Sequence, residues 1–215
     1  MPRSTDPGEF RGEAPAMLQS PGTVERLRQL ALEGGAALSC EGATQIVPGE
    51  GNPQAEIVLV GEAPGEEEDR QGRPFVGRSG KLLDRVLNTA GLDRSDVWIT
   101  NTVKCRPVSF EGGRARNRAP RVGEIKAWTP ILENEIALIR PKLLVGLGAV
   151  AGKALLGSGF RITQSRGAFF EESTLGLPVI VTWHPAYLLR QQGESYQERL
   201  REAIADFSLA RDRLM

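Results

Sequence analysis

The chain has 215 residues, of which 40% are hydrophobic and 25% charged, and its formal net charge at pH 7 is zero. This length and composition fit one α/β domain with its own core. Zero net charge argues against a surface that is basic all over, although a local basic face remains open. No apolar run approaches the roughly 18 residues that cross a bilayer, and the first residues lack the apolar stretch of a signal peptide.

The predicted elements begin after an irregular segment. Proline and glycine are frequent in residues 1–22, which show no apolar periodicity, so we expect a flexible N-terminal tail there. Residues 23–215 are expected to form a single domain. Its first predicted helix covers residues 23–32, with Thr23 as the N-cap. The two cysteines of the chain, Cys40 and Cys105, are expected to form no disulfide framework and suit a reducing cytoplasm.

From residue 57 onward, predicted strands and helices alternate. The strands cover residues 57–60, 97–100, 143–147 and 178–183, and the helices cover residues 79–90, 124–139, 149–156 and 196–214. Continuous apolar strands separated by helices are typical of a parallel sheet that is covered on both faces. The sequence therefore predicts an α/β fold, a three-layer α/β/α sandwich with a four-stranded, mainly parallel central sheet.

Polar side chains follow three of these strands. The only histidine, His184, comes after the fourth strand, and Gly61-Glu-Ala-Pro-Gly65 comes after the first. Asn101, at the end of the second strand, offers both a donor and an acceptor. A lone histidine is more often structural than functional. The carboxyl ends of strands line the ligand crevice of an open α/β sheet, however, so together these loops predict a functional site.

Three further patterns allow two interpretations each. Seven basic residues between 104 and 126 fit either a solvated loop or a phosphate-binding face. The four acids at 66–69 normally mark a solvated face, yet a carboxylate beside a strand end could also orient water. Residues 146–151 match a dinucleotide-binding pattern, but close packing of a helix on a strand needs the same small residues. The acids about 20 residues further on lie in a stretch that looks like a hairpin.

Taken in order, the motifs resemble the uracil-DNA glycosylase superfamily, specifically its family 4 type, over roughly residues 37–200. The resemblance rests on residues 47–52, 61–84, 99–107, 139–142 and 147–149 and on His184-Pro-Ala-Tyr-Leu-Leu-Arg190. Residues 154–167 are closer to the related X-type enzymes, which trap their DNA product covalently.

The resemblance implies a monofunctional enzyme that flips uracil out of DNA and hydrolyses its N-glycosidic bond, leaving an abasic site. Phe75 would stack on the base and Asn101 would hydrogen-bond its polar edge. His184 would donate to the O2 oxygen of the departing uracil, and Glu62 would position water and stabilise the cationic sugar. Glu68 or Asp69 would help Glu62, and both are assigned to this site. Gly61, Ala63 and Gly65 would contact the substrate.

The resemblance also implies a surface that binds DNA. Leu188 and Leu189 would wedge into the gap left in the base stack, and Arg190 would hold a phosphate. The other residues assigned to DNA are Arg78, Lys104, Arg114, Arg116, Asn117 and Arg118. The implied partners are uracil-containing DNA, single- or double-stranded, and free uracil as the product. We expect a monomer in a bacterial-type cytoplasm, at the nucleoid when it acts on DNA, with no membrane partner.

The chain departs from its family at the iron–sulfur ligands. Family 4 enzymes hold a 4Fe–4S cluster on four cysteine thiolates. Cys105 fits the third ligand position, but Trp128 stands at the fourth. The first two positions fall within residues 33–37, which contain no cysteine, and Cys40 comes too late in the chain to be either of them. We therefore expect no cluster, no other cofactor and no metal, with Trp128 filling part of the space.

Two alternatives to this enzyme stay open. The first is a cluster-less paralogue that binds DNA or a nucleobase but no longer excises it, and the second is a nucleotide-binding oxidoreductase, which rests only on residues 146–151. Within the enzyme interpretation, Asn117 stands where X-type enzymes carry the histidine that bonds to the sugar. We therefore expect the DNA product to be released rather than trapped.

Overall fold

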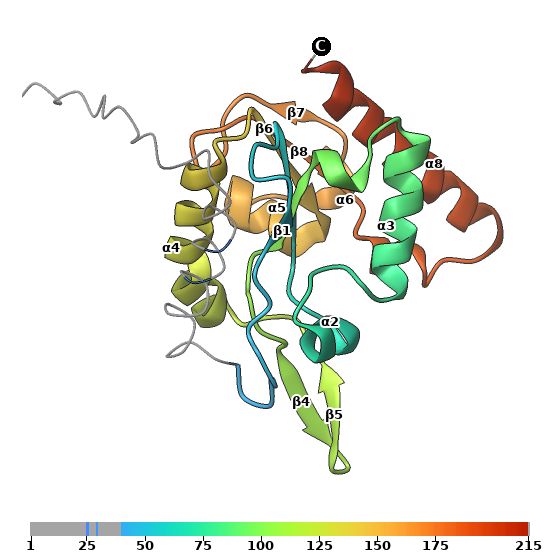
Figure 1. Cartoon of the computed structure of the whole chain (residues 1–215). Coiled ribbons are helices and arrows are strands. Elements are labelled where there is room, and N and C mark those ends of the chain that lie inside the picture. Colours follow the sequence, from blue (N-terminus) through green and yellow to red (C-terminus); the bar gives the residue numbers. More distant parts are fainter. Residues whose placement is uncertain (1–24, 26–28, 30–39, 215) are drawn as a thin grey trace, which may run out of the picture.

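The structure, a computed structural model, describes residues 25, 29 and 40–214 (Figure 1). The expected tail, residues 1–22, lies outside the described residues, as does the expected helix at residues 23–32 except for Glu25 and Gln29. Among the helices that are described, none is long and apolar enough to cross a lipid bilayer.

A six-stranded mixed sheet in the order β1-β3-β2-β6-β8-β7 forms the centre of the fold. Its strands are β1 (Glu50–Gly51), β2 (Ile57–Gly61), β3 (Trp98–Asn101), β6 (Leu143–Leu147), β7 (Phe169–Phe170) and β8 (Val179–Thr182). The four central strands are parallel, whereas β1 and β7 pair antiparallel at the two edges. The α/β class is confirmed, but the expected count of four strands missed both edges, because two-residue strands are too short to show a hydrophobic pattern.

Helices cover both faces of this sheet, with α4 (Val122–Ile139) on one side and α3 (Arg78–Thr89) and α8 (Gly193–Asp212) on the other (Figure 1). Successive strand side chains point to opposite faces, so Leu59 packs with α3 and α8 while Val58 packs with α4 and with α5 (Gly148–Leu156). The shorter helices are α2 (Glu66–Gln71), η2 (Arg94–Asp96), α6 (Ile162–Ser165) and α7 (Pro185–Leu188). The N-cap of α3 is Gly77.

The basic segment after β3 forms a β-hairpin instead of a loop. Strands β4 (Val108–Glu111) and β5 (Arg114–Asn117) pair antiparallel and project from the body of the domain (Figure 1). The two residues between them, Gly112 and Gly113, both have positive φ, at 58° and 77°, as the tight turns that suit the twist of a hairpin require.

Cys40 and Cys105 form a disulfide bond, so the expectation that the two cysteines do not pair was wrong. Both are buried in a small apolar cluster with Val103 and Trp128. The two cysteines are 65 positions apart, and the turns and helices that bring them together leave no trace in the local sequence. Their pairing was therefore not readable from spacing alone.

Candidate active site

A cavity of about 560 Å³ opens at the carboxyl ends of the parallel strands. It is lined by Glu62, which follows β2, by Asn101, the last residue of β3, by Gly148, which follows β6, and by His184, which follows β8. A size of this order suits a small ligand, and the position is the one where open α/β sheets bind ligands. The structure therefore brings together three of the predicted polar residues, as the strand order required.

Asn101, which lines the cavity, lies beside Gly61 and Phe75. Asn101 is buried, and its Oδ1 is one of three buried side-chain nitrogen or oxygen atoms in the described part of the chain that lack a hydrogen-bond partner. A Cβ atom on Gly61 would lie 2.3 Å from that oxygen and 2.6 Å from the Phe75 ring. Only glycine lets the amide and the ring approach so closely. An unpartnered buried acceptor is costly, so this oxygen is available to a donor that enters the cavity.

The imidazole of His184 is held in one tautomer. Its Nδ1 accepts a hydrogen bond from the backbone N–H of Ala186 at 3.1 Å. Burial, assisted by the positive charge of Arg190, lowers the pKa of His184 to about 4. The ring is therefore neutral at pH 7, and because Nδ1 is an acceptor the proton is on Nε2. The ring lies 5.8 Å from that of Phe75, centroid to centroid, so the site has a neutral donor beside a flat apolar surface.

Glu62 is the carboxylate of the cavity. Burial raises its pKa above the usual value, and the charge of Arg190 opposes that rise. Arg190 itself is exposed and lines the mouth of the same cavity. In its ionised form, a partly desolvated carboxylate can accept a proton from water or stabilise a positive charge.

The other two acidic residues assigned to this site have different roles. Both carboxylate oxygens of Glu68 accept backbone N–H groups, from Gly65 at 3.1 Å, Val76 at 3.0 Å and Gly77 at 2.8 Å. Asp69 is buried away from the cavity, where it accepts from the backbone and hydroxyl of Thr44 at 2.9 and 2.8 Å. Asp69 does not line the cavity, so the structure gives no support for its helping Glu62. Glu68 does line the cavity, and its assistance to Glu62 stays a prediction.

Two residues assigned to DNA contact are inside the protein. Lys104 is fully buried, and its Nζ donates to Thr100 Oγ1 and the Asn101 carbonyl, both at 2.6 Å, and to Glu135 Oε2 at 2.7 Å. Leu188 is 1% exposed and belongs to the core. Neither can touch DNA in this structure, and those two assignments were wrong. The sequence could not distinguish Lys104 from the exposed basic residues that follow it, or Leu188 from Leu189, because the pattern of residue types is the same whether a side chain is buried or exposed.

Of the remaining assigned residues, Asn117, Arg118 and Arg190 line the cavity, whereas Arg78, Arg114, Arg116 and Leu189 do not. Arg78, Arg114, Arg116 and Arg190 are exposed, and Leu189 is partly buried. Arg118 lines the cavity while its guanidinium pairs with Glu124 at 2.6 Å, which commits much of its charge to the protein. Asn117 also lines the cavity and accepts from Arg106 Nε at 2.6 Å. Ala63 and Gly65 also line the cavity.

The structure adds residues to the site that the sequence did not single out. Tyr187 lines the cavity and stacks on Trp183 at 4.9 Å between ring centroids. It lies within the His184–Arg190 motif, so its position could have been noticed. Ile162 and Thr163 come from α6, and no pattern marked them. Gly148, part of the dinucleotide-like pattern, has room for no Cβ, which would lie 2.8 Å from His184 Cβ; packing therefore accounts for this small residue.

The residues near Trp128 do not fit a four-thiolate cluster. The only two cysteines of the sequence are bonded to each other, and the indole of Trp128 is fully buried against them. Within the described residues, no group of three or more His, Cys, Asp or Glu side chains is placed to hold a metal ion. We therefore derive no step of the chemistry through iron and sulfur.

Comparison with known proteins agrees with this geometry. The model of the uracil DNA glycosylase superfamily matches residues 48–208. The chain is 43% identical to a type-4 uracil-DNA glycosylase of Sulfurisphaera tokodaii, over 79% of this chain and 74% of that protein. It is 43% identical to the type-4 enzyme of Thermotoga maritima, over 75% and 80%, and 40% identical to that of Saccharolobus solfataricus, over 79% and 81%. The chain belongs to the uracil-DNA glycosylase superfamily.

Proposed function

We propose that this protein removes uracil from DNA by hydrolysing the bond between the base and the sugar. The observation that carries the proposal is the unpartnered Oδ1 of Asn101, buried beside the Phe75 ring in a cavity that also holds His184. The N3–H of uracil is the donor this oxygen lacks, whereas N3 of cytosine carries no proton and would leave two acceptors facing each other. The amide thus favours uracil over the base from which it arises.

The remaining groups divide the chemistry between them. The oxygen of a water molecule bonds to C1′ of the sugar, and the electrons of the C1′–N1 bond leave with the base. The neutral Nε2–H of His184 donates to the O2 oxygen where that negative charge collects, and ionised Glu62 stabilises the positive sugar and takes the proton of the water. Donors and charges that are already in place act mainly in the transition state. The anion then takes a proton from solvent and leaves as free uracil.

DNA would lie across the mouth of the cavity. Exposed Arg190 lines that cavity. Arg78, Arg114 and Arg116 are also exposed and offer further positive charge, that of Arg116 beside Glu111 at 3.1 Å, and phosphate contacts of this kind set affinity without reading sequence. Leu189 is the remaining candidate for the wedge. Phe110, 60% exposed on the hairpin, offers a further surface on which an unpaired base could stack.

We further propose that the protein works as a monomer, without an iron–sulfur cluster or other cofactor, on DNA in the cytoplasm. Support for the monomer is that one chain supplies every group used in the mechanism. Support for the absence of a cluster is the cysteine pair occupied in a disulfide and packed against Trp128. The disulfide itself is more typical of oxidising compartments. The proposed cytoplasmic location is therefore supported by the DNA substrate and not by the cysteines.

An oligonucleotide with one uracil tests the proposal. After incubation with the protein and alkaline treatment, we expect strand cleavage at the uracil, no cleavage of the matched cytosine oligonucleotide, and no protein–DNA adduct on a denaturing gel. Asn101→Ala should abolish most of the cleavage while leaving the binding of uracil-free DNA in place. DNA binding by the wild-type protein without any cleavage would instead favour the paralogue that does not excise.

A further inference from the structure

Phe75 holds an unusual backbone conformation. Its φ is 52°, and among the described residues Arg140 is the one other non-glycine residue with a positive φ. Arg140 lies at the C-terminal cap of α4, where left-handed residues are common. Phe75 lies at no helix end, and for a bulky side chain this conformation is an outlier that the surroundings must enforce. Residues kept in such conformations concentrate at functional sites.

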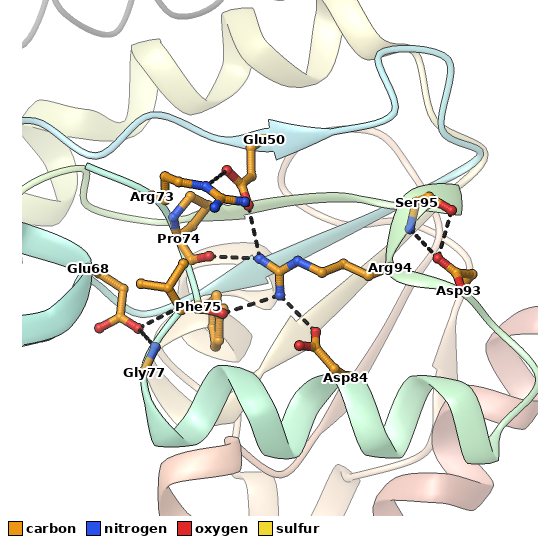
Figure 2. A network of polar contacts seen from close by, with 11 residues as sticks. Glu50, Glu68, Arg73, Pro74, Phe75, Gly77, Asp84, Asp93, Arg94 and Ser95 are labelled. Carbon is orange, nitrogen blue, oxygen red and sulfur yellow. Dashed lines mark hydrogen bonds and ion pairs between the residues drawn. The ribbon is translucent and has the colours of Figure 1, made fainter. Parts of the chain in front are cut away.

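On one side of Phe75, a single guanidinium holds the chain. Arg94, in η2, donates from Nη2 to the Pro74 carbonyl at 2.8 Å and from Nη1 to the Phe75 carbonyl at 3.2 Å (Figure 2). The guanidinium is itself fixed by Asp84 at 2.9 Å and by Glu50 at 3.2 Å. One planar group thus binds two successive carbonyls and two carboxylates, which requires the fork of an arginine.

A carboxylate and a glycine complete the restraint on Phe75. Glu68 accepts the N–H groups of the two residues that follow Phe75, namely Val76 and Gly77 (Figure 2). Gly80 lies so close that a Cβ atom there would be 1.8 Å from the Phe75 carbonyl oxygen. The peptide groups on both sides of Phe75 are therefore held, and the ring is held toward His184 in the cavity.

We propose that Arg94 is a positioning residue for the base, acting through the backbone of Phe75 without touching substrate. Arg94 is not among the residues that line the cavity. By fixing the left-handed conformation before the base arrives, it presents the ring for stacking at no further cost in ordering. The inference rests on the proposed function, in which Phe75 stacks on uracil.

The test uses three variants of the full chain. Arg94→Lys keeps the charge but cannot serve all four acceptors. Gly80→Ala leaves Arg94 itself unchanged but would place a methyl group 1.8 Å from the Phe75 carbonyl oxygen, the atom that accepts from Arg94 Nη1, and so displaces Phe75. Arg73→Gln is the matched control, because Arg73 pairs with the same Glu50 at 2.8 Å yet is exposed and donates to neither carbonyl. We expect Arg94→Lys and Gly80→Ala each to lower single-turnover excision roughly tenfold or more, the effect of weakening one base–aromatic stack, and Arg73→Gln to change it less than twofold.

A double-mutant cycle separates positioning from a general loss of structure. In a Phe75→Ala background, Arg94→Lys should lower excision by less than twofold, because the ring through which it acts is gone. Loss by the same factor in both backgrounds, or wild-type excision by Arg94→Lys, would overturn the proposal. Thermal melting of each variant shows whether it is folded.

Binding of free uracil, followed by ligand-observed NMR, provides a readout that needs no excision. Arg94→Lys should weaken it and Arg73→Gln should not. If the wild-type protein binds free uracil but excises none, the proposed function fails while the positioning role is still tested by this comparison. If it neither excises uracil nor binds it, both fail.

Discussion

Replacing Lys104 with methionine should destabilise the protein severely, although the residue belongs to a basic cluster that suggests DNA binding. Its ammonium is fully buried, with three acceptors at 2.6–2.7 Å, of which only Glu135 carries a charge. Burial lowers the pKa of Lys104 and the adjacent carboxylate opposes that shift. In Lys104→Met, the Glu135 carboxylate keeps its bonds from Trp98 Nε1 and Thr100 Oγ1 but loses its counter-charge.

Breaking a buried pair in this way costs about 3–5 kcal/mol. For a domain of this size, 1 kcal/mol shifts the melting temperature by roughly 2–4 °C, so the midpoint should fall by about 6–20 °C. The double variant Lys104→Met/Glu135→Gln removes both charges and keeps an acceptor for Trp98. It should recover at least half of the loss, because no lone charge then remains in the core.

Urea unfolding at pH 7 measures both effects as changes in the free energy of unfolding. Lys142→Met is the control, since Lys142 forms an exposed ion pair with Glu56, and pairs of that kind contribute about 1 kcal/mol or less. The reasoning is refuted if Lys104→Met costs no more than this control, or if the double variant is no more stable than the single one. The salt dependence of DNA binding should stay unchanged in folded Lys104→Met.

Four further predictions follow from the site. His184→Ala and Glu62→Gln should each lower single-turnover excision by roughly tenfold to a thousandfold while DNA affinity changes far less, because both act in the transition state; equal losses in affinity would contradict their roles. Changing Arg114 and Arg116 together to alanine should do the reverse, with the slope of log K against log salt reduced by about 2 in binding titrations. Excision should show no titration near pH 6.5, because the pKa of His184 is lowered to about 4. It should decline on acidification as Glu62, whose pKa is raised, takes up a proton. Arg190→Gln should move this decline to higher pH, since the charge of Arg190 lowers the pKa values of both Glu62 and His184. Protein purified anaerobically should be colourless and free of stoichiometric iron, and a brown sample would refute the loss of the cluster.

The sequence was most informative where a residue's role follows from its place at a strand end. Four apolar runs located the parallel strands, and their carboxyl ends brought Glu62, Asn101 and His184 into one cavity. It was less informative where burial decides the role. Lys104 and Asp69 carry charges in clusters that look solvated, and only tertiary contacts show that both are enclosed.

The sequence analysis did not predict the hairpin of β4 and β5, although a local signal for it exists, and it did not predict the role of Arg94, for which no local signal exists. Two glycines between alternating segments are a hairpin signal, and the turn at Gly112 and Gly113 could have been recognised. Arg94 is different, because its contacts with Phe75 and Glu50 span 19 and 44 positions. No pattern within a single helix or strand predicts that the Arg94 side chain binds the backbone of a residue so distant in the sequence.

The Cys40–Cys105 bond closes the chain into a ring with a separation of 65 residues, and Glu62, Phe75 and Asn101 all lie on that ring. A closed loop of that length removes conformational freedom from the unfolded chain equivalent to about 4 kcal/mol in the chain-entropy account. His184 lies outside the ring. An oxidised chain therefore begins to refold with the base-reading half of its pocket already tethered, whereas a reduced chain must assemble both halves by diffusion alone.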